Sequence, residues 1–226
     1  MNKKEISDLE NAISFRFKDQ SILKRSLTHK SFDKNNNNEI LEFLGDRVLG
    51  LVISEKLIRD FPNEAVGLLD KRYSKLVNKE TCHKISQSFN LGDFILLGQT
   101  EINSKGNEKK SILADACESL IGAIYSDSGY GESRKFIFKF WNKEFELLKN
   151  SNLVDPKSFL QEWTLNRYKE LPEYKLLGQS GPDHNLLFSV ELSFKEYKKA
   201  TKEGKSIKDA EMKAAESFIK LNNIDK

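Results

Sequence analysis

Apolar residues in the first two thirds of the chain recur at spacings of three and four, the period of an amphipathic helix. The pattern is clearest over residues 41–53, 112–124 and 136–148. Strict alternation of apolar and polar residues, typical of a half-buried strand, is absent up to about Leu148. We therefore predict a helical region, in which Phe61-Pro62-Asn63 ends the helix that holds Leu51 and Leu57, because proline disfavours helical backbone before it.

Two polar stretches within this region predict loops. Asn35 to Asn38 is a low-complexity asparagine run, for which we expect a flexible loop before a helix. Gly98 to Lys110 is polar throughout much of its length, and we expect a second loop there.

The pattern changes after Asn150, where Asn-Ser-Asn is followed by Asp155-Pro156. We predict a helical domain at 1–149, a linker at 150–154 and a second domain at 155–226. The second domain has the predicted order α-β-β-β-α, with both helices on one face of an antiparallel sheet. Its expected elements are Lys157 to Lys169, Tyr174 to Leu177, Leu186 to Phe194, Tyr197 to Lys202 and Ser206 to Leu221. The predicted fold class is thus mainly α, an all-helical domain followed by a small α+β domain.

Composition adds few constraints. The chain has 226 residues, a net charge of +3 and 38% hydrophobic residues, which is ordinary for a globular protein and does not by itself indicate a nucleic-acid binder. Cys82 and Cys117 lie far apart, with neither a metal-ligand spacing nor a disulfide framework, so we expect a reduced, cytoplasmic setting. The N-terminus lacks the apolar run of a signal peptide, and no stretch is long enough to span a bilayer, so we expect no membrane partner.

Acidic residues stand out within two of the apolar helices. Glu39, Glu42 and Asp46 are spaced i, i+3 and i+7, on one face of the first, and Asp115 and Glu118 are three apart in the second. Each face could simply be solvated. Two such faces within apolar helices instead favour a bound cation, because unpaired carboxylates are costly to bury, and oxygen ligands favour Mg²⁺.

The segment Leu-Glu-Phe-Leu-Gly-Asp at residues 41–46 resembles the signature of the bacterial ribonuclease III family. Leu-Thr-His-Lys-Ser at 27–31 and Ser-Ile-Leu-Ala-Asp at 111–115 resemble two further blocks of that family, in the same order. The tail resembles a double-stranded-RNA-binding domain through Gly-Pro-Asp-His at 181–184 and its alanine-rich last helix. The resemblance therefore covers nearly the whole chain.

The resemblance implies an endoribonuclease that hydrolyses double-stranded RNA with Mg²⁺, which Mn²⁺ can replace, leaving 5′-phosphate and 3′-hydroxyl ends. It implies processing of ribosomal RNA precursors and other structured transcripts. It also implies a homodimer, in which Phe43 fits a socket on the other subunit.

The family resemblance also assigns roles to the acids. Glu42, Asp115 and Glu118 are expected to bind Mg²⁺. Glu118 is expected to be essential for catalysis, with Asp46 acting beside it, and Glu39 matches an outer acidic position. One departure is Val66, where the family usually has an acid; Glu64 lies close in the sequence.

In the tail, the resemblance implies minor-groove contacts from the first helix and the following loop, and phosphate contacts at the start of the last helix. The expected residues are Gln161, Glu162, His184, Lys205 and Lys208, with Lys213 as a further candidate. Ile207 breaks the basic pair that the family usually has there, so we expect weaker phosphate binding.

Two other functions remain open at this point. A duplex-RNA-binding regulator would have a catalytic domain that only dimerises; the four central acids are all present, which argues against it, and Val66 leans towards it. A helical metal phosphohydrolase acting on small nucleotides would usually have His-Asp metal pairs, which this chain lacks.

Overall fold

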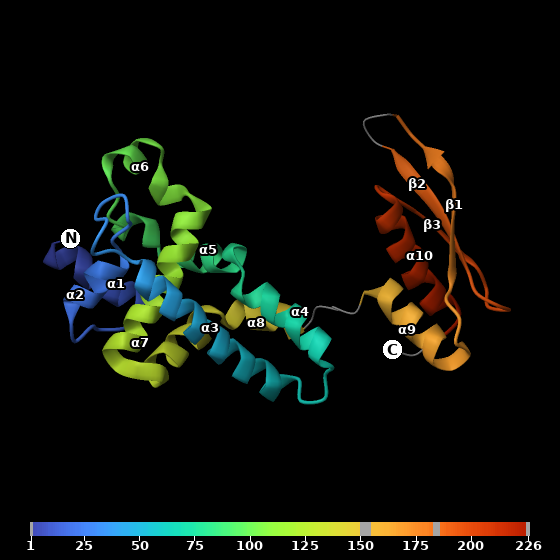
Figure 1. Cartoon of the computed structure of the whole chain (residues 1–226), viewed down its shortest axis with the longest axis horizontal. Coiled ribbons are helices and arrows are strands. Elements are labelled where there is room, and N and C mark those ends of the chain that lie inside the picture. Colours follow the sequence, from blue (N-terminus) through green and yellow to red (C-terminus); the bar gives the residue numbers. More distant parts are fainter. Residues whose placement is uncertain (1, 150–154, 183–185, 225–226) are drawn as a thin grey trace. The chain divides into compact units, whose positions relative to one another are not determined.

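The computed structural model describes residues 2–149, 155–182 and 186–224. Its internal contacts divide the chain into two compact units, Met1–Ser151 and Asn152–Lys226, called unit 1 and unit 2 below (Figure 1). The expected linker at 150–154 and the expected RNA contact His184 lie outside the described residues.

Unit 1 is helical in its described part, as the apolar period predicts. Its α-helices are α1 (Lys3–Ile13), α2 (Gln20–Ser26), α3 (Glu39–Asp60), α4 (Val66–Val77), α5 (Lys79–Ser88), α6 (Gln99–Asn103), α7 (Lys110–Phe140) and α8 (Asn142–Lys149). Two short 3₁₀ helices are η1 (Leu91–Phe94) and η2 (Gly106–Glu108). Helix α3 ends immediately before Phe61-Pro62, as predicted.

Three details of unit 1 differ from the sequence prediction. The expected loop from Gly98 to Lys110 contains α6 and η2, and Lys109 Nζ bonds Glu101 Oε2 at 2.7 Å across the segment. The third periodic stretch is two helices, since α7 ends at Phe140 and α8 begins at Asn142.

The third difference lies in the asparagine run, which forms the predicted loop before α3 but is packed at its end. Asn37 and Asn38 are buried, and the amide of Asn38 donates to the carbonyl of Thr28 at 2.9 Å. Arg25 Nε also donates to the carbonyl of Asn37 at 3.1 Å. The end of the run is therefore packed against the helices, and α3 begins directly after it.

The core of unit 1 lies where α3 packs along α7 (Figure 1). Leu49, Ile53, Leu120 and Ile121 are fully buried there. Trp141 is also fully buried, and its Nε1 donates to the carbonyl of Leu76 at 2.8 Å. The two helices that carry the predicted acids are thus the central pair of the unit.

Unit 2 has the predicted α-β-β-β-α order. Its elements are α9 (Pro156–Tyr168), β1 (Glu173–Ser180), β2 (Leu187–Ser193), β3 (Ala200–Gly204) and α10 (Ile207–Leu221). The strands form one antiparallel sheet in the order β1-β2-β3, and both helices lie on the same side of it (Figure 1). The predicted inner face of α10 is confirmed, since Ala210, Ala214, Ala215 and Phe218 are fully buried.

Two strands of unit 2 have other bounds than predicted. β1 continues to Ser180 through an irregularity between Leu176 and Gly178. The third strand begins at Ala200, because Tyr197 lies in a turn in which its amide donates to the carbonyl of Phe194. The ring of Tyr197 packs on the core of the unit.

Candidate active site and nucleic-acid interface

Two glycines allow α3 and α7 to cross with their backbones in contact. A Cβ atom at Gly45 would lie 1.7 Å from the carbonyl oxygen of Glu118. A Cβ atom at Gly122 would lie 2.1 Å from the carbonyl oxygen of Leu41. Any larger residue at either position would push the helices apart, so this close crossing sets the distance between the acids of α3 and those of α7.

Three carboxylates meet beside the crossing. Glu42 from α3 and Asp115 and Glu118 from α7 each offer an oxygen, and these oxygens all lie within 4.8 Å of one another. Glu118 is buried, with 8% of its surface exposed, and the other two are half-buried. An all-oxygen donor set of this size and charge fits a hard divalent cation such as Mg²⁺.

The electrostatics of the cluster also favour a bound cation. Burial, followed by repulsion from the carboxylates of Asp46, Glu42 and Asp115, raises the pKa of Glu118 to about 7. Burial and the neighbouring Asp115 also raise the pKa of Glu42. A bound divalent cation would remove this mutual repulsion and hold the carboxylates in their ionised form.

Two further side chains touch the cluster, and neither was predicted from the sequence. Lys79 Nζ lies 3.0 Å from Asp115 Oδ1, and this contact raises the pKa of the lysine. The Cys82 thiol is buried and donates to Glu118 Oε1 at 3.6 Å. Asn78, the N-cap of α5, is the signal that could have placed a helix start at Lys79, but no pattern connects that start with an acid 36 residues away.

The two other predicted acids of α3, Asp46 and Glu39, lie outside the close group. Asp46 pairs with Arg47 at 2.8 Å, although it lies near enough to Glu118 to raise the pKa of that residue. Glu39 is exposed and pairs with Lys30 at 3.0 Å. The predicted shared face of α3 therefore contributes one carboxylate, Glu42, to the three-oxygen cluster.

Phe43 lies on the outward side of α3. Its side chain is 62% exposed, and the Arg47 guanidinium lies 3.8 Å from the ring centre. Ile40, Leu51 and Ile58 on the same helix are also exposed. A group of large apolar side chains that are exposed to solvent on one helix is typical of a protein contact surface.

Val66, the residue that departs from the family pattern, lies at the start of α4 and faces solvent. The nearby carboxylate of Glu64 accepts from Arg72 Nε at 2.5 Å and from Arg72 Nη2 at 2.7 Å. Because both oxygens of Glu64 are engaged by Arg72, this residue does not replace the missing acid.

In unit 2, the expected RNA-binding residues lie on α9 and around the start of α10. Gln161 is half-buried and Glu162 exposed, while Lys205 and Lys208 are both exposed. Lys213 Nζ is paired with Asp209 Oδ2 at 2.8 Å, which leaves less of its charge for phosphate than the sequence suggests.

Comparisons with known proteins agree with this arrangement. The model of the family described as Ribonuclease-III-like matches residues 19–144, and that of the Double-stranded RNA binding motif matches residues 156–221. Ribonuclease 3 of Pelagibacter ubique is 45% identical over 92% of this chain and 92% of its own length. Ribonuclease 3 of Caulobacter vibrioides is 40% identical over 95% and 94%.

A solved structure also resembles unit 1. The nuclease domain of ribonuclease III from Campylobacter jejuni is 46% identical, with a TM-score of 0.61, and covers 62% of this chain and 99% of that one. That structure is described as showing flexibility in a region involved in dimer formation.

Proposed function

The chain belongs to the ribonuclease III family and is a double-stranded-RNA-specific endoribonuclease, and we propose that Glu42, Asp115 and Glu118 hold the divalent cation of its reaction. The observation that carries this proposal is the approach of their oxygens to within 4.8 Å of one another. Mg²⁺ is the expected ion, and Mn²⁺, which accepts the same ligands, the expected substitute.

The proposed chemistry is hydrolysis of the phosphodiester bond. An oxygen of water bonds to phosphorus, the bond to the 3′-oxygen breaks, and the products carry a 5′-phosphate and a 3′-hydroxyl. A divalent cation held by Glu42, Asp115 and Glu118 would supply an activated water and would stabilise charge on the leaving oxygen. Glu118 is the residue on which the site depends most, because it is the buried member of the cluster. Asp46 acts beside it, and Glu39 provides outer negative charge.

Lys79 is proposed as a positioning residue. Its ammonium group bonds Asp115 Oδ1, so it orients that carboxylate and offsets part of the local negative charge. The lysine thereby reduces the net negative charge of the cluster.

A homodimer is proposed through the exposed apolar side of α3. Phe43 is the expected anchor, because large, exposed aromatic side chains dominate the energetics of protein contacts. A dimer would bring two cleavage sites to one duplex, one for each strand.

Unit 2 is proposed to hold the duplex through Gln161, Glu162 and His184 in the minor groove and through Lys205 and Lys208 on the phosphates. Ribosomal RNA precursors and other structured transcripts are the proposed targets. The intact acids favour cleavage over the alternative of a duplex-binding regulator.

The test is incubation of the purified protein with a long RNA duplex. We expect cleavage with Mg²⁺ or Mn²⁺ and intact RNA with EDTA. Intact duplex across a titration of both ions would refute the enzymatic role of the carboxylate cluster.

A further inference from the structure

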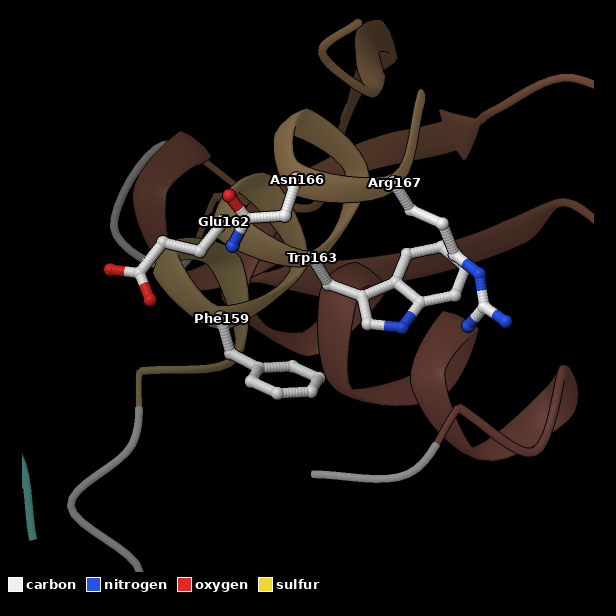
Figure 2. A pocket seen from close by; sticks show the side chains of 5 residues that line it. All are labelled: Phe159, Glu162, Trp163, Asn166 and Arg167. Carbon is white, nitrogen blue, oxygen red and sulfur yellow. The ribbon is translucent and has the colours of Figure 1, made fainter. Parts of the chain in front are cut away.

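Unit 2 carries a pocket on α9 that the functions proposed above use only at Glu162. It has a volume of about 470 Å³ and is lined by Phe159, Glu162, Trp163, Asn166 and Arg167 (Figure 2). These residues follow the spacing i, i+3, i+4, i+7 and i+8, so they share one face of the helix. The volume lies within the range of small-molecule sites in proteins.

The floor of this pocket is aromatic and firmly held. Phe159 and Trp163 are half-buried and pack against the core of unit 2. The ring of Trp163 lies 5.7 Å from that of Tyr168 and 5.7 Å from that of Tyr197, measured between centres. The indole therefore has a fixed position, which suits it to stack against a flat ligand.

The rim of the pocket is polar and exposed to solvent. The side chains of Glu162, Asn166 and Arg167 are exposed, and in the described part of the chain neither Glu162 nor Asn166 forms a side-chain hydrogen bond or ion pair. Arg167 has its guanidinium 5.6 Å from the centre of the Trp163 ring (Figure 2). A hydrogen-bond acceptor, an amide and a cation thus surround an aromatic surface.

We propose that this pocket receives an unpaired nucleotide of the RNA substrate, one that has left the duplex as a bulge or at its end. A nucleobase stacks on aromatic side chains, and its edge offers donors and acceptors that match carboxylate and amide groups. The guanidinium of Arg167 complements the phosphate of the same nucleotide.

The position of the pocket selects RNA as its occupant. Glu162 belongs both to the pocket and to the proposed minor-groove face, and Gln161 of that face is its neighbour in the sequence. A duplex held there would bring an extruded nucleotide to the next face of the same helix. An apolar side chain of a protein partner would cover the aromatic floor but leave the three polar side chains at the rim without partners.

The inference rests on the proposed RNA-binding role of unit 2, and one titration tests both. The full chain is titrated in EDTA, which prevents cleavage, with two duplexes of the same sequence. One is fully paired, and the other carries a single unpaired 2-aminopurine, whose fluorescence falls when it stacks. We expect about tenfold tighter binding of the bulged duplex, near the lower end of what a single stacked base contributes, together with quenching.

Two variants of exposed pocket residues make the test specific. Asn166→Ala and Arg167→Gln should bind both duplexes with affinities within about twofold of each other and should weaken the quenching. Lys175→Gln is the matched control, because it removes a cation from an exposed position on β1 outside the pocket. It should keep the wild-type preference.

Equal affinity of the wild-type protein for both duplexes would overturn the inference, and the aromatic floor would then be assigned to a protein contact. Wild-type preference in both pocket variants would also overturn it. Failure to bind either duplex would refute the proposed RNA-binding face, and this inference with it.

Discussion

Glu118→Gln is expected to make the metal-free protein more stable while abolishing most of its activity. Burial and three neighbouring carboxylates raise the pKa of Glu118 from its ordinary value of 4.5 to about 7. As the pH rises from 4.5, the unfolded chain therefore releases this proton before the folded protein does. The contribution of this carboxyl to the free energy of unfolding is therefore fully present below pH 4.5. It is lost as the pH rises through about 7, where the folded protein must ionise the group.

The size of this loss follows from the shift in pKa. A shift of one unit corresponds to about 1.4 kcal/mol, so the rise of Glu118 from 4.5 to about 7 costs the folded state roughly 3 kcal/mol above pH 7. Glutamine is neutral at every pH and can still accept the bond from the Cys82 thiol. The Glu118→Gln variant should therefore not lose this stability at high pH. At pH 8 the Tm of its unit 1 should be roughly 10 °C higher than that of the wild-type protein.

Scanning calorimetry of the full chain in EDTA at pH 5 and pH 8 measures the difference. Most of the difference in Tm between the variant and the wild-type protein should develop as the pH rises from 5 to 8. The transition of unit 2 serves as an internal reference. Mg²⁺ should stabilise the wild-type protein more than the variant, because the variant has lost a ligand. Cleavage of duplex RNA by the variant should be very slow.

Glu39→Gln is the matched control, since it removes an exposed carboxylate from α3 whose ion pair with Lys30 is worth less than about 1 kcal/mol. If Glu118→Gln and the wild-type protein had the same dependence of Tm on pH, the carboxylate of Glu118 would not be held at a raised pKa. Wild-type cleavage rates for the variant at low Mg²⁺ would refute its place in the site.

Two further predictions concern α3. Phe43→Ala should raise the dissociation constant of the dimer in sedimentation equilibrium, because its ring is the largest exposed apolar side chain on α3; a wild-type monomer at micromolar concentration would refute the interface. Gly45→Ala should cost about 3 kcal/mol or more in urea unfolding, because its Cβ would overlap the backbone of Glu118. Gly67→Ala, whose Cβ meets nothing within 4 Å, should instead gain about 0.5–1 kcal/mol, and equal effects of the two substitutions would refute the close-crossing argument.

The helices and the central acids were predictable because they depend on local periodicity. The spacing of apolar residues around Glu42 and Glu118 defines both helices, and the acids stand out against it. The three-residue separation of Asp115 and Glu118 is likewise a local property of a helix. These features need no knowledge of which parts of the chain come together.

Contacts between distant segments were not predictable in the same way. The pairing of Lys79 with Asp115, which lie 36 residues apart, depends on how α5 packs against α7 in unit 1. The short helix α6 was missed because its five residues are mostly polar and have no apolar period. In unit 2, the start of β3 was misplaced because tyrosine is common in strands, whereas Tyr197 lies in a turn and packs its ring on the core.

The contact between α3 and α7 at Gly45 and Gly122 has a consequence for divergence among sequences of this kind. Both contacts are made by main-chain atoms, so the gap that separates the two sets of carboxylates depends on the absence of two methyl groups rather than on the identity of the surrounding side chains. Leu, Ile and Val can therefore be exchanged in the core over time while the ligand spacing stays constant. A single mutation at either glycine would change that spacing at once, so these two positions should tolerate far less drift than the apolar core that encloses them.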